Sequence, residues 1–192
     1  MMKRILILLV ILLITDRAFT QKQDSITAIA DSSAKILTWE IQKFENRTLM
    51  LLDVPYQRDN YNSTEYISLT VAKDSSEMRP LFISIIIPND VIQSNGIFIK
   101  FANTIKTKEG ETKIEPEKSN PEIIPIESCD EVTCTTKIIA GYLTNEKTRS
   151  KIDIFQKFID FDNAVFLLEY PDGSHKSVVI PLLTFKEKYK TL

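Results

Sequence analysis

Short segments that suit β-strands recur along most of this chain and limit the folds open to it. Residues 36–44 and 65–73 alternate apolar and polar side chains, and residues 81–87 form a β-rich run that is expected to be buried. Turn residues separate such segments, and Pro55 is expected to end the second strand. Strands are expected at residues 36–44, 48–54, 65–73, 81–87, 96–101, 134–143, 164–170 and 177–183. This pattern, with one late helix, predicts a mainly β chain folded as an antiparallel β-sandwich.

Two segments near the C-terminus predict helices. In residues 145–159, apolar side chains such as Phe155 and Phe158 recur at helical spacing, which indicates an inserted amphipathic helix that Thr144 can cap. Residues 184–187 match the S/T-x-x-E capping box, so a short C-terminal helix is expected to begin there. The alternation of the first strand is expected to point Trp39 into the core.

The length of 192 residues fits one folded domain, which we expect at residues 35–192. The polar residues 21–34 are expected to form a flexible lead-in. Residues 106–125 carry three prolines and many charges, so they are predicted to form an exposed loop, with a short edge strand at residues 123–126.

The N-terminus predicts a secretory signal peptide at residues 1–20. Lys3 and Arg4 precede an apolar run at residues 5–14, which is shorter than the ~20 residues that span a bilayer. Cleavage is expected after Thr20, giving a periplasmic or secreted protein. An uncleaved membrane anchor is the alternative, and membrane association is expected only through this segment.

Cys129 and Cys134 are the two cysteines of the chain, and both follow the predicted signal. Paired thiols in an oxidising compartment form disulfides, so these two are predicted to be bridged. The alternative is a redox centre. The four intervening residues, two of them acidic, argue against a stabilised thiolate, so a structural disulfide is expected.

No residue pattern predicts catalysis. His175 is the single histidine and lies in a predicted turn, while the acidic candidates lie on a helix face or in turns, where carboxylates usually contact water. These acidic candidates are Asp153, Asp160, Asp162 and Glu169. Residues 160–163 resemble part of a calcium loop but lack its glycine and terminal glutamate. We therefore expect no catalytic residues, no metal and no cofactor.

The net charge of -2 and the acidic pI of about 5.6 provide no electrostatic basis for binding nucleic acid or anionic lipid. No nucleic-acid partner is expected.

The order of features over residues 80–192 resembles the invasion-associated locus B family of alphaproteobacterial envelope proteins. Residues 86–91 and 94–99 look like the strand, proline turn, glycine and strand of that family, and Cys129 and Cys134 are similar to its C-x4-C pair. The helix, the hairpin and the ending from Pro181 to Leu192 also resemble the family pattern.

The resemblance implies an immunoglobulin-like β-sandwich that is linked, in some bacteria, to host-cell invasion. The expected function is therefore that of a non-enzymatic envelope protein that acts through contacts with a protein in the envelope or on host cells. Envelope stress tolerance is a further role that such contacts could serve. Two alternatives stay open: a carrier that holds a small ligand in the apolar interior between the sheets, and an enzyme.

Overall fold

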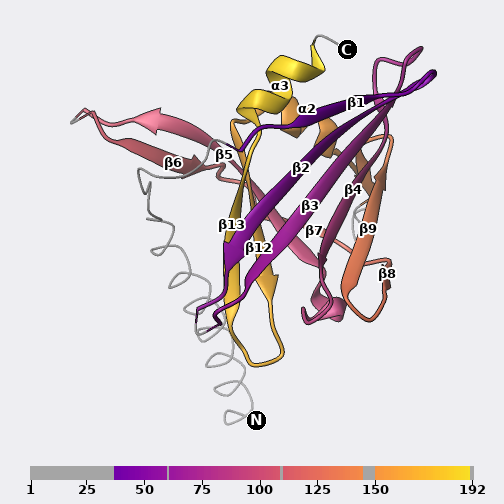
Figure 1. Ribbon diagram of the computed structural model, residues 1–192. Helices are drawn as coiled ribbons and strands as arrows, with labels where there is room; N and C mark the ends of the chain where they lie inside the picture. Colours follow the sequence, from indigo (N-terminus) through magenta and orange to yellow (C-terminus); the bar gives the residue numbers. More distant parts are fainter. Residues whose placement is uncertain (1–36, 60, 109, 145–149, 191–192) are drawn as a thin grey trace, which may run out of the picture. The chain divides into compact units, whose positions relative to one another are not determined.

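The computed structural model describes residues 37–59, 61–108, 110–144 and 150–190, and Lys35–Leu192 form one compact unit. The described part is mainly β, with antiparallel strands and two helices, as the sequence predicts (Figure 1). The strands are β1 (Glu40–Lys43), β2 (Arg47–Gln57), β3 (Thr64–Asp74), β4 (Pro80–Pro88), β5 (Ile97–Lys106), β6 (Thr112–Pro116), β7 (Glu122–Ile124), β8 (Ser128–Cys129), β9 (Thr133–Ile139), β10 (Tyr142–Thr144), β11 (Lys151–Asp153), β12 (Asn163–Glu169) and β13 (His175–Pro181). The helices are α2 (Ile154–Asp160) and α3 (Leu183–Tyr189), with a 3-10 turn η1 (Gln93–Asn95) before β5.

Two antiparallel sheets form the layers of a β-sandwich. The six-stranded sheet has the order β1-β2-β3-β4-β9-β8, and the second sheet has the order β13-β12-β5-β6, with β7 also paired to β5. Figure 1 shows β12 and β13 crossing behind β2 and β3. Strands β10 and β11 form a separate pair.

The core lies between the two sheets, where alternate side chains of both are buried. Met50, Ile67 and Ile85 from the six-stranded sheet join Phe101 and Phe166 from the second sheet in one apolar cluster, and each is at most 1% exposed. This alternation is what half-buried antiparallel strands require.

Trp39 closes the side of the sandwich between β2 and β13, and its inward orientation is confirmed. Its side chain is fully buried, its ring centroid lies 5.0 Å from that of Phe185 in α3, and its indole Nε1 donates to the Pro181 carbonyl at 3.0 Å. The Lys188 ammonium of α3 donates to the Trp39 carbonyl. One residue therefore ties the start of the described chain to the second sheet and to its last helix.

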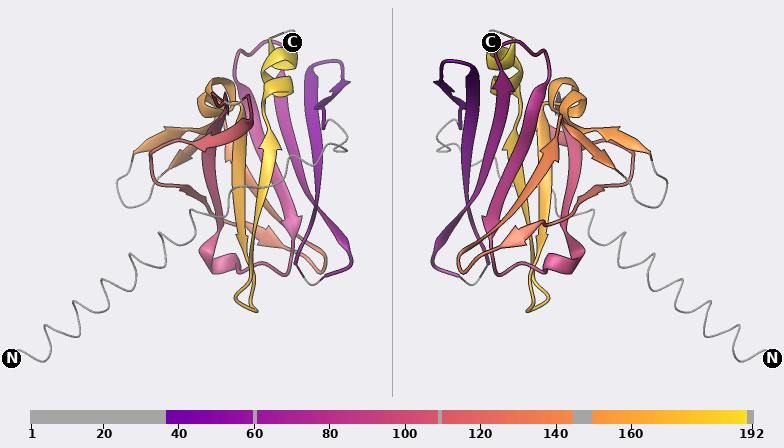
Figure 2. Two further views of the ribbon diagram at one scale, coloured as in Figure 1. Left: turned by 90° about the vertical axis from the view of Figure 1, so that its left-hand side faces the viewer. Right: turned by 90° about the vertical axis from the view of Figure 1, so that its right-hand side faces the viewer.

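Helices α2 and α3 lie at one end of the sandwich (Figure 2). Their rings form an aromatic cluster there. Phe158 of α2 packs edge-on against Phe185 at 5.7 Å between ring centroids, and Phe155 lies 4.9 Å from Tyr189. The close approach of α2 to the preceding chain requires Gly141, because a Cβ built there would lie 2.4 Å from the Cβ of Phe155, and its φ is +75°.

The second strand does not end at Pro55 as predicted. It continues to Gln57 because Pro55 occupies a register position whose missing N–H costs no sheet hydrogen bond. The Phe44 amide donates to the Arg47 carbonyl at 2.7 Å, so odd-numbered residues of β2 direct their backbone groups toward the β1 side. β1 pairs only with Thr48–Leu51, so Pro55 faces an edge that carries no strand in the described part of the chain.

The predicted helix at residues 145–159 is shorter than expected. Residues 145–149 lie outside the described residues, residues 151–153 form strand β11, and helix α2 begins at Ile154. Thr144 lies in β10 rather than at a helix cap, and the Asp153 carboxylate accepts from the Gln156 amide instead. The helical spacing of apolar residues before 154 was misleading because Ile152 also fits a strand that pairs with Leu143.

Two further details correct the sequence analysis. The predicted exposed loop at residues 106–125 contains strand β6, which was not predicted: Thr112–Pro116 pairs with the outer end of β5, which extends beyond the rest of both sheets in Figure 1. The short edge strand expected at residues 123–126 is present as β7, at Glu122–Ile124. The predicted capping box is wrong, because α3 begins at Leu183 with Leu182 as its N-cap. Thr184 therefore lies inside the first turn, where its hydroxyl has no partner among the described residues.

The position of Trp39 generates a stability prediction. Trp39→Ala should lower the free energy of unfolding by about 3–5 kcal/mol, because a large fully buried ring leaves a cavity between two sheets and a helix. Urea denaturation followed by far-UV circular dichroism measures the change. Phe44→Ala, at a ring that is 58% exposed, should stay within about 0.5 kcal/mol. Equal losses for the two variants would contradict the role given to Trp39.

Candidate functional site

The two cysteines are joined in a disulfide that closes the turn between β8 and β9. Cys129 and Cys134 are directly opposed in the register, with their Cα atoms 4.0 Å apart. Within the turn, the Asp130 carboxylate accepts from the Val132 and Thr133 amides, which holds the pKa of Asp130 below its usual value. Cys134 is fully buried in the core cluster, so the bridge fastens an exposed turn to the six-stranded sheet.

The candidate catalytic residues lie apart in the described structure. His175 is exposed at the start of β13, and Asp160 is exposed at the end of α2. Asp153 caps α2 and pairs with Arg79, while the Glu169 carboxylate accepts from the Asn95 amide at 2.8 Å. Asp153 and Glu169 thus contact a cation and amide groups, which is how carboxylates of a folded scaffold are ordinarily satisfied.

The resemblance of residues 160–163 to a calcium loop has another explanation. The Asp162 carboxylate accepts from the Lys186 ammonium of α3 at 2.9 Å and from the Thr104 amide of β5 at 3.1 Å. Asp162 thereby joins the helix to the second sheet. Within the described ranges, no group of three or more His, Cys, Asp or Glu side chains is placed to hold a metal ion.

Asp162 generates a pH prediction. Its hydrogen bonds, first from Lys186 and then from Thr104, lower its pKa below the usual 3.8. A lowered pKa in the folded state contributes stability that is present above the unfolded pKa and is lost as the pH falls through the folded one. Asp162→Asn should therefore cost about 1–2 kcal/mol at pH 7 and less at pH 3, below the unfolded pKa. Urea denaturation at both pH values measures this. A cost that does not depend on pH would contradict it, and Asp160→Asn is the exposed control.

A buried arginine at the opposite end from the helices was not predicted. Arg58 follows β2 in a segment expected to be loop, yet its side chain is only 5% exposed. Its guanidinium stacks over the rings of Tyr61 and Tyr170, at 4.0 and 3.6 Å from their centroids. It pairs with three carboxylates, of Asp90 beside β4, of Asp172 at 3.3 Å in the β12–β13 turn and of Glu65 at 3.9 Å in β3.

The hydroxyls of Tyr56 and Tyr170 lie 3.0 Å apart beside this arginine. Burial raises the pKa of Tyr170 to about 12, and burial raises that of Tyr56 as well, so both stay protonated at neutral pH. Since these acids and rings come from β3 and from separate turns, Arg58 fastens these segments together. The cluster is therefore a structural element of this end of the sandwich.

The Arg58 cluster generates a second stability prediction. Arg58→Met should lower the free energy of unfolding by about 2–3 kcal/mol. The loss is smaller than for a fully buried pair, because the side chains of Asp90 and Asp172 are 45% and 47% exposed and can regain water. Lys176→Met is the matched control. It breaks a pair with Asp59, whose side chain is 87% exposed, and should cost less than about 0.5 kcal/mol by urea denaturation. A cost for Arg58→Met no larger than for the control would contradict the prediction.

The strongest candidate for a binding site is the outer face of the six-stranded sheet, here called the binding face. Its side chains alternate along β2, β3, β4 and β9 with the residues of the core, and the strand register places them on one surface. Its members are Leu49, Leu51, Asp53, Pro55, Tyr66, Ser68, Thr70, Ala72, Phe82, Ser84, Ile86, Pro88, Thr133, Thr135, Lys137 and Ile139.

An apolar row crosses the binding face. The register aligns Leu49 with Ala72, Ala72 with Phe82, and Phe82 with Ile139, so four strands place apolar side chains side by side. Ile139 is 64% exposed and Ala72 is fully buried, although it faces away from the core. An antiparallel sheet face that meets water normally carries polar side chains. A contiguous apolar row in their place is typical of a surface that a partner covers.

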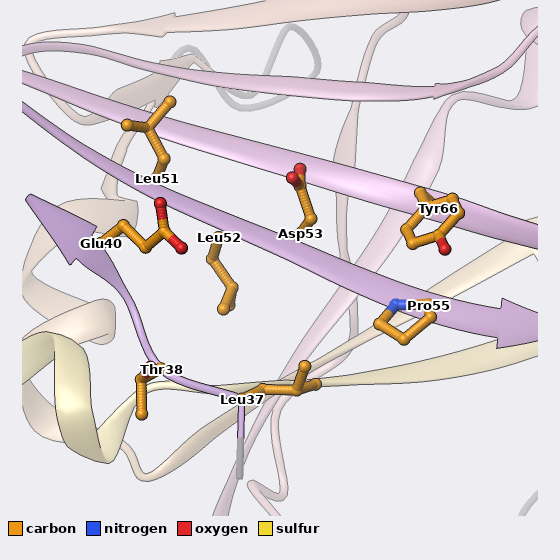
Figure 3. Close-up of a pocket in the computed structure, with 8 residues that line it drawn as sticks. All are labelled: Leu37, Thr38, Glu40, Leu51, Leu52, Asp53, Pro55 and Tyr66. Atoms are coloured by element: carbon orange, nitrogen blue, oxygen red, sulfur yellow. The ribbon is translucent and has the colours of Figure 1, made fainter. Parts of the chain in front are cut away.

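A cavity of about 320 Å³ continues the binding face at the β1 edge (Figure 3). It is lined by Leu37, Thr38, Glu40, Leu51, Leu52, Asp53, Pro55 and Tyr66. The hollow forms because β1 pairs with β2 only as far as Leu51, after which the edge of β2 is left without a strand in the described residues. Figure 3 shows the carboxylates of Glu40 and Asp53 beside apolar side chains, so the cavity suits a group that is cationic at its tip and apolar along its stem.

The sequence carries a signal of the binding face. Residues 49–52 are apolar at consecutive positions, and residues 81–87 are apolar except at Ser84, whereas a strand with one wet face alternates. Such runs indicate strands covered on both faces. With a single core between two sheets, the second apolar face must lie on the outside.

The described part of the chain contains no helix long and apolar enough to cross a membrane. The disulfide is compatible with an extracytoplasmic location.

Comparisons with models of protein families, with curated proteins and with solved structures find no match to this chain.

Proposed function

We propose that this chain is a non-enzymatic protein of the bacterial periplasm or cell exterior that acts through protein contacts made by its binding face. The observation that carries the proposal is the apolar row from Leu49 to Ile139 on an outer sheet face. The predicted signal peptide and the Cys129–Cys134 bridge support the compartment. The resemblance to the invasion-associated locus B family supports a role in envelope stress tolerance or host association.

The proposed contact is with a protein rather than with nucleic acid or a charged lipid surface. The sixteen members of the binding face include one cation, Lys137, and one anion, Asp53, and the rest are uncharged. Beyond Leu49 and Ala72, the same face continues to Arg47 and Asp74, which are directly opposed in the register at the end of β2 and β3. Interface cores of this kind are depleted in charge and rich in apolar and aromatic side chains. Tyr66, 54% exposed near the lower end of the face, adds an aromatic anchor.

A small-ligand carrier is the second candidate function, and the cavity at the β1 edge is the observation that favours it. The interior between the sheets, expected to hold such a ligand, is occupied by side chains such as Phe101, Phe166 and Ile85, each fully buried. The carrier function is therefore proposed only at the edge cavity.

Site-specific photocrosslinking in cells tests the protein-contact function. A photoreactive phenylalanine analogue placed at Phe82 or Ile139 should give covalent adducts with a protein, because both positions lie in the apolar row. The matched control is Val179, which faces outward on the second sheet and is also partly exposed. Adducts from Phe82 and Ile139 that are absent from Val179 would support the function. No adduct from either position, or equal yields from the control, would overturn it.

A further inference from the structure

Opposite charges lie at the two sides of the binding face, while Arg47 and Asp74 lie opposite each other where β2 begins and β3 ends. Glu40 of β1 and Asp53 of β2 are acidic and line the edge cavity, while Lys137 of β9 lies on the opposite side. The register connects Glu40 through Leu51, Thr70 and Ser84 to Lys137, so one straight row begins with an acid and ends with a base. None of these three charges forms an ion pair with another described residue.

We propose that the partner of the binding face is a second copy of this chain, packed face to face about a twofold axis that runs parallel to the strands above β3. The proposal rests on the proposed function, since it uses the same face. A surface with an acid at one side, a base at the other and an uncharged centre is complementary to itself, which is what a closed twofold interface requires.

The register fixes which residues meet in this arrangement. An axis above β3 places β2 of one copy over β4 of the other, and β1 over β9. Leu49 then opposes Phe82 of the second copy in the apolar row, and Tyr66 opposes its own counterpart on the axis. Glu40 opposes Lys137 of the second copy at both sides of the interface. The strands of the two copies stay aligned, as in ordinary face-to-face sheet packing.

The alternative twofold axis, which runs across the strands, does not bring opposite charges together. It would leave β1 over β1 and β9 over β9, so that Glu40 faces the acidic side of the second copy and Lys137 faces its basic side. Like charges placed opposite each other are unfavourable. The distribution of charge therefore selects the axis parallel to the strands.

The edge cavity provides a seat for Lys137 of the second copy. Its apolar lining, including Leu37 and Pro55, suits the aliphatic stem of a lysine, and Glu40 and Asp53 suit its ammonium group. Within one copy, the Lys137 ammonium lies 5.6 Å from the centroid of the Phe82 ring and forms no ion pair with a described residue. A single self-complementary contact thus explains the apolar row, the acidic cavity and the isolated lysine together.

The interface is small, so the dimer should be weak. Five strands span about 19 Å at a spacing of about 4.8 Å. A standard interface buries about 800 Å² per partner, which corresponds to a square about 28 Å wide, so this face is narrower. Self-association in the micromolar range, roughly 1–100 µM, is expected.

Sedimentation velocity from about 1 to 300 µM tests the proposal with charge-swapped variants of the chain. The wild-type chain, 22.0 kDa with its signal, should shift from monomer to twice the monomer mass across this range. Lys137→Glu and Glu40→Lys should each weaken the dimer at least about tenfold, because each places like charges in contact. The double variant should regain most of the wild-type association, since it restores the pair with the charges exchanged. Lys113→Glu on β6, 55% exposed and outside the binding face, should change nothing.

Each outcome decides the proposal. A wild-type chain that stays monomeric up to about 300 µM, or a dimer that both single variants leave unchanged, overturns the second copy as partner. Failure of the double variant to recover, with circular dichroism showing all variants folded, also overturns the Glu40–Lys137 contact. Photocrosslinks from Ile139 to a different protein, together with a monomer in sedimentation, would overturn this inference and leave the proposed function standing. The absence of any adduct would remove the proposed function itself.

Discussion

The burial of Trp39 between the two layers is the contact on which the rest of the sandwich depends. On this side the edge strands of the two sheets are β1 and β13, and β1 covers only part of β2, which makes few other contacts with β13. The indole fills the space, hydrogen bonds to Pro181 and supports Phe185 of the last helix. Since Trp39 precedes every strand and Phe185 follows every strand, the contact joins the two ends of the folded unit. The aromatic cluster at that end then positions α2 through Phe155 and Phe158.

The opposite end of the sandwich is held by charge instead of aromatic packing. Arg58 gathers acids from turns that follow β4 and β12, and Tyr170 lies beneath its guanidinium. With both ends fixed in this way, the six-stranded sheet is held from both ends, and the side chains of its outer face do not contribute to the core. Such a face is a suitable place for recognition, because partners bind best to groups that are already ordered.

Strand alternation and turn residues were enough to predict most of the fold, because these patterns depend on neighbours in sequence. The hairpin of β12 and β13, the strand through residues 65–73 and the inward Trp39 follow directly from them. The errors occurred where distant contacts decide the outcome. Pro55 is tolerated only because its edge lacks a paired strand, and the helix starts late because residues 151–153 pair with β10. The binding face could not be assembled from sequence, because Leu49, Phe82 and Ile139 become neighbours only once the strand order is known.

The two prolines at the open side of the sandwich limit how this protein can assemble. The backbone of Pro55 in β2 faces the open edge of its sheet, away from β3. The backbone of Pro181 in β13 also faces an open edge, away from β12, because the adjacent Leu182 amide donates to the Asp162 carbonyl on the β12 side. Each strand therefore lacks one of the donors that an incoming strand would need to extend its sheet. Growth by continuous strand addition, which leads to fibres, is hindered at these edges. Contact between two copies through their sheet faces, as proposed for this chain, instead stops at a closed pair.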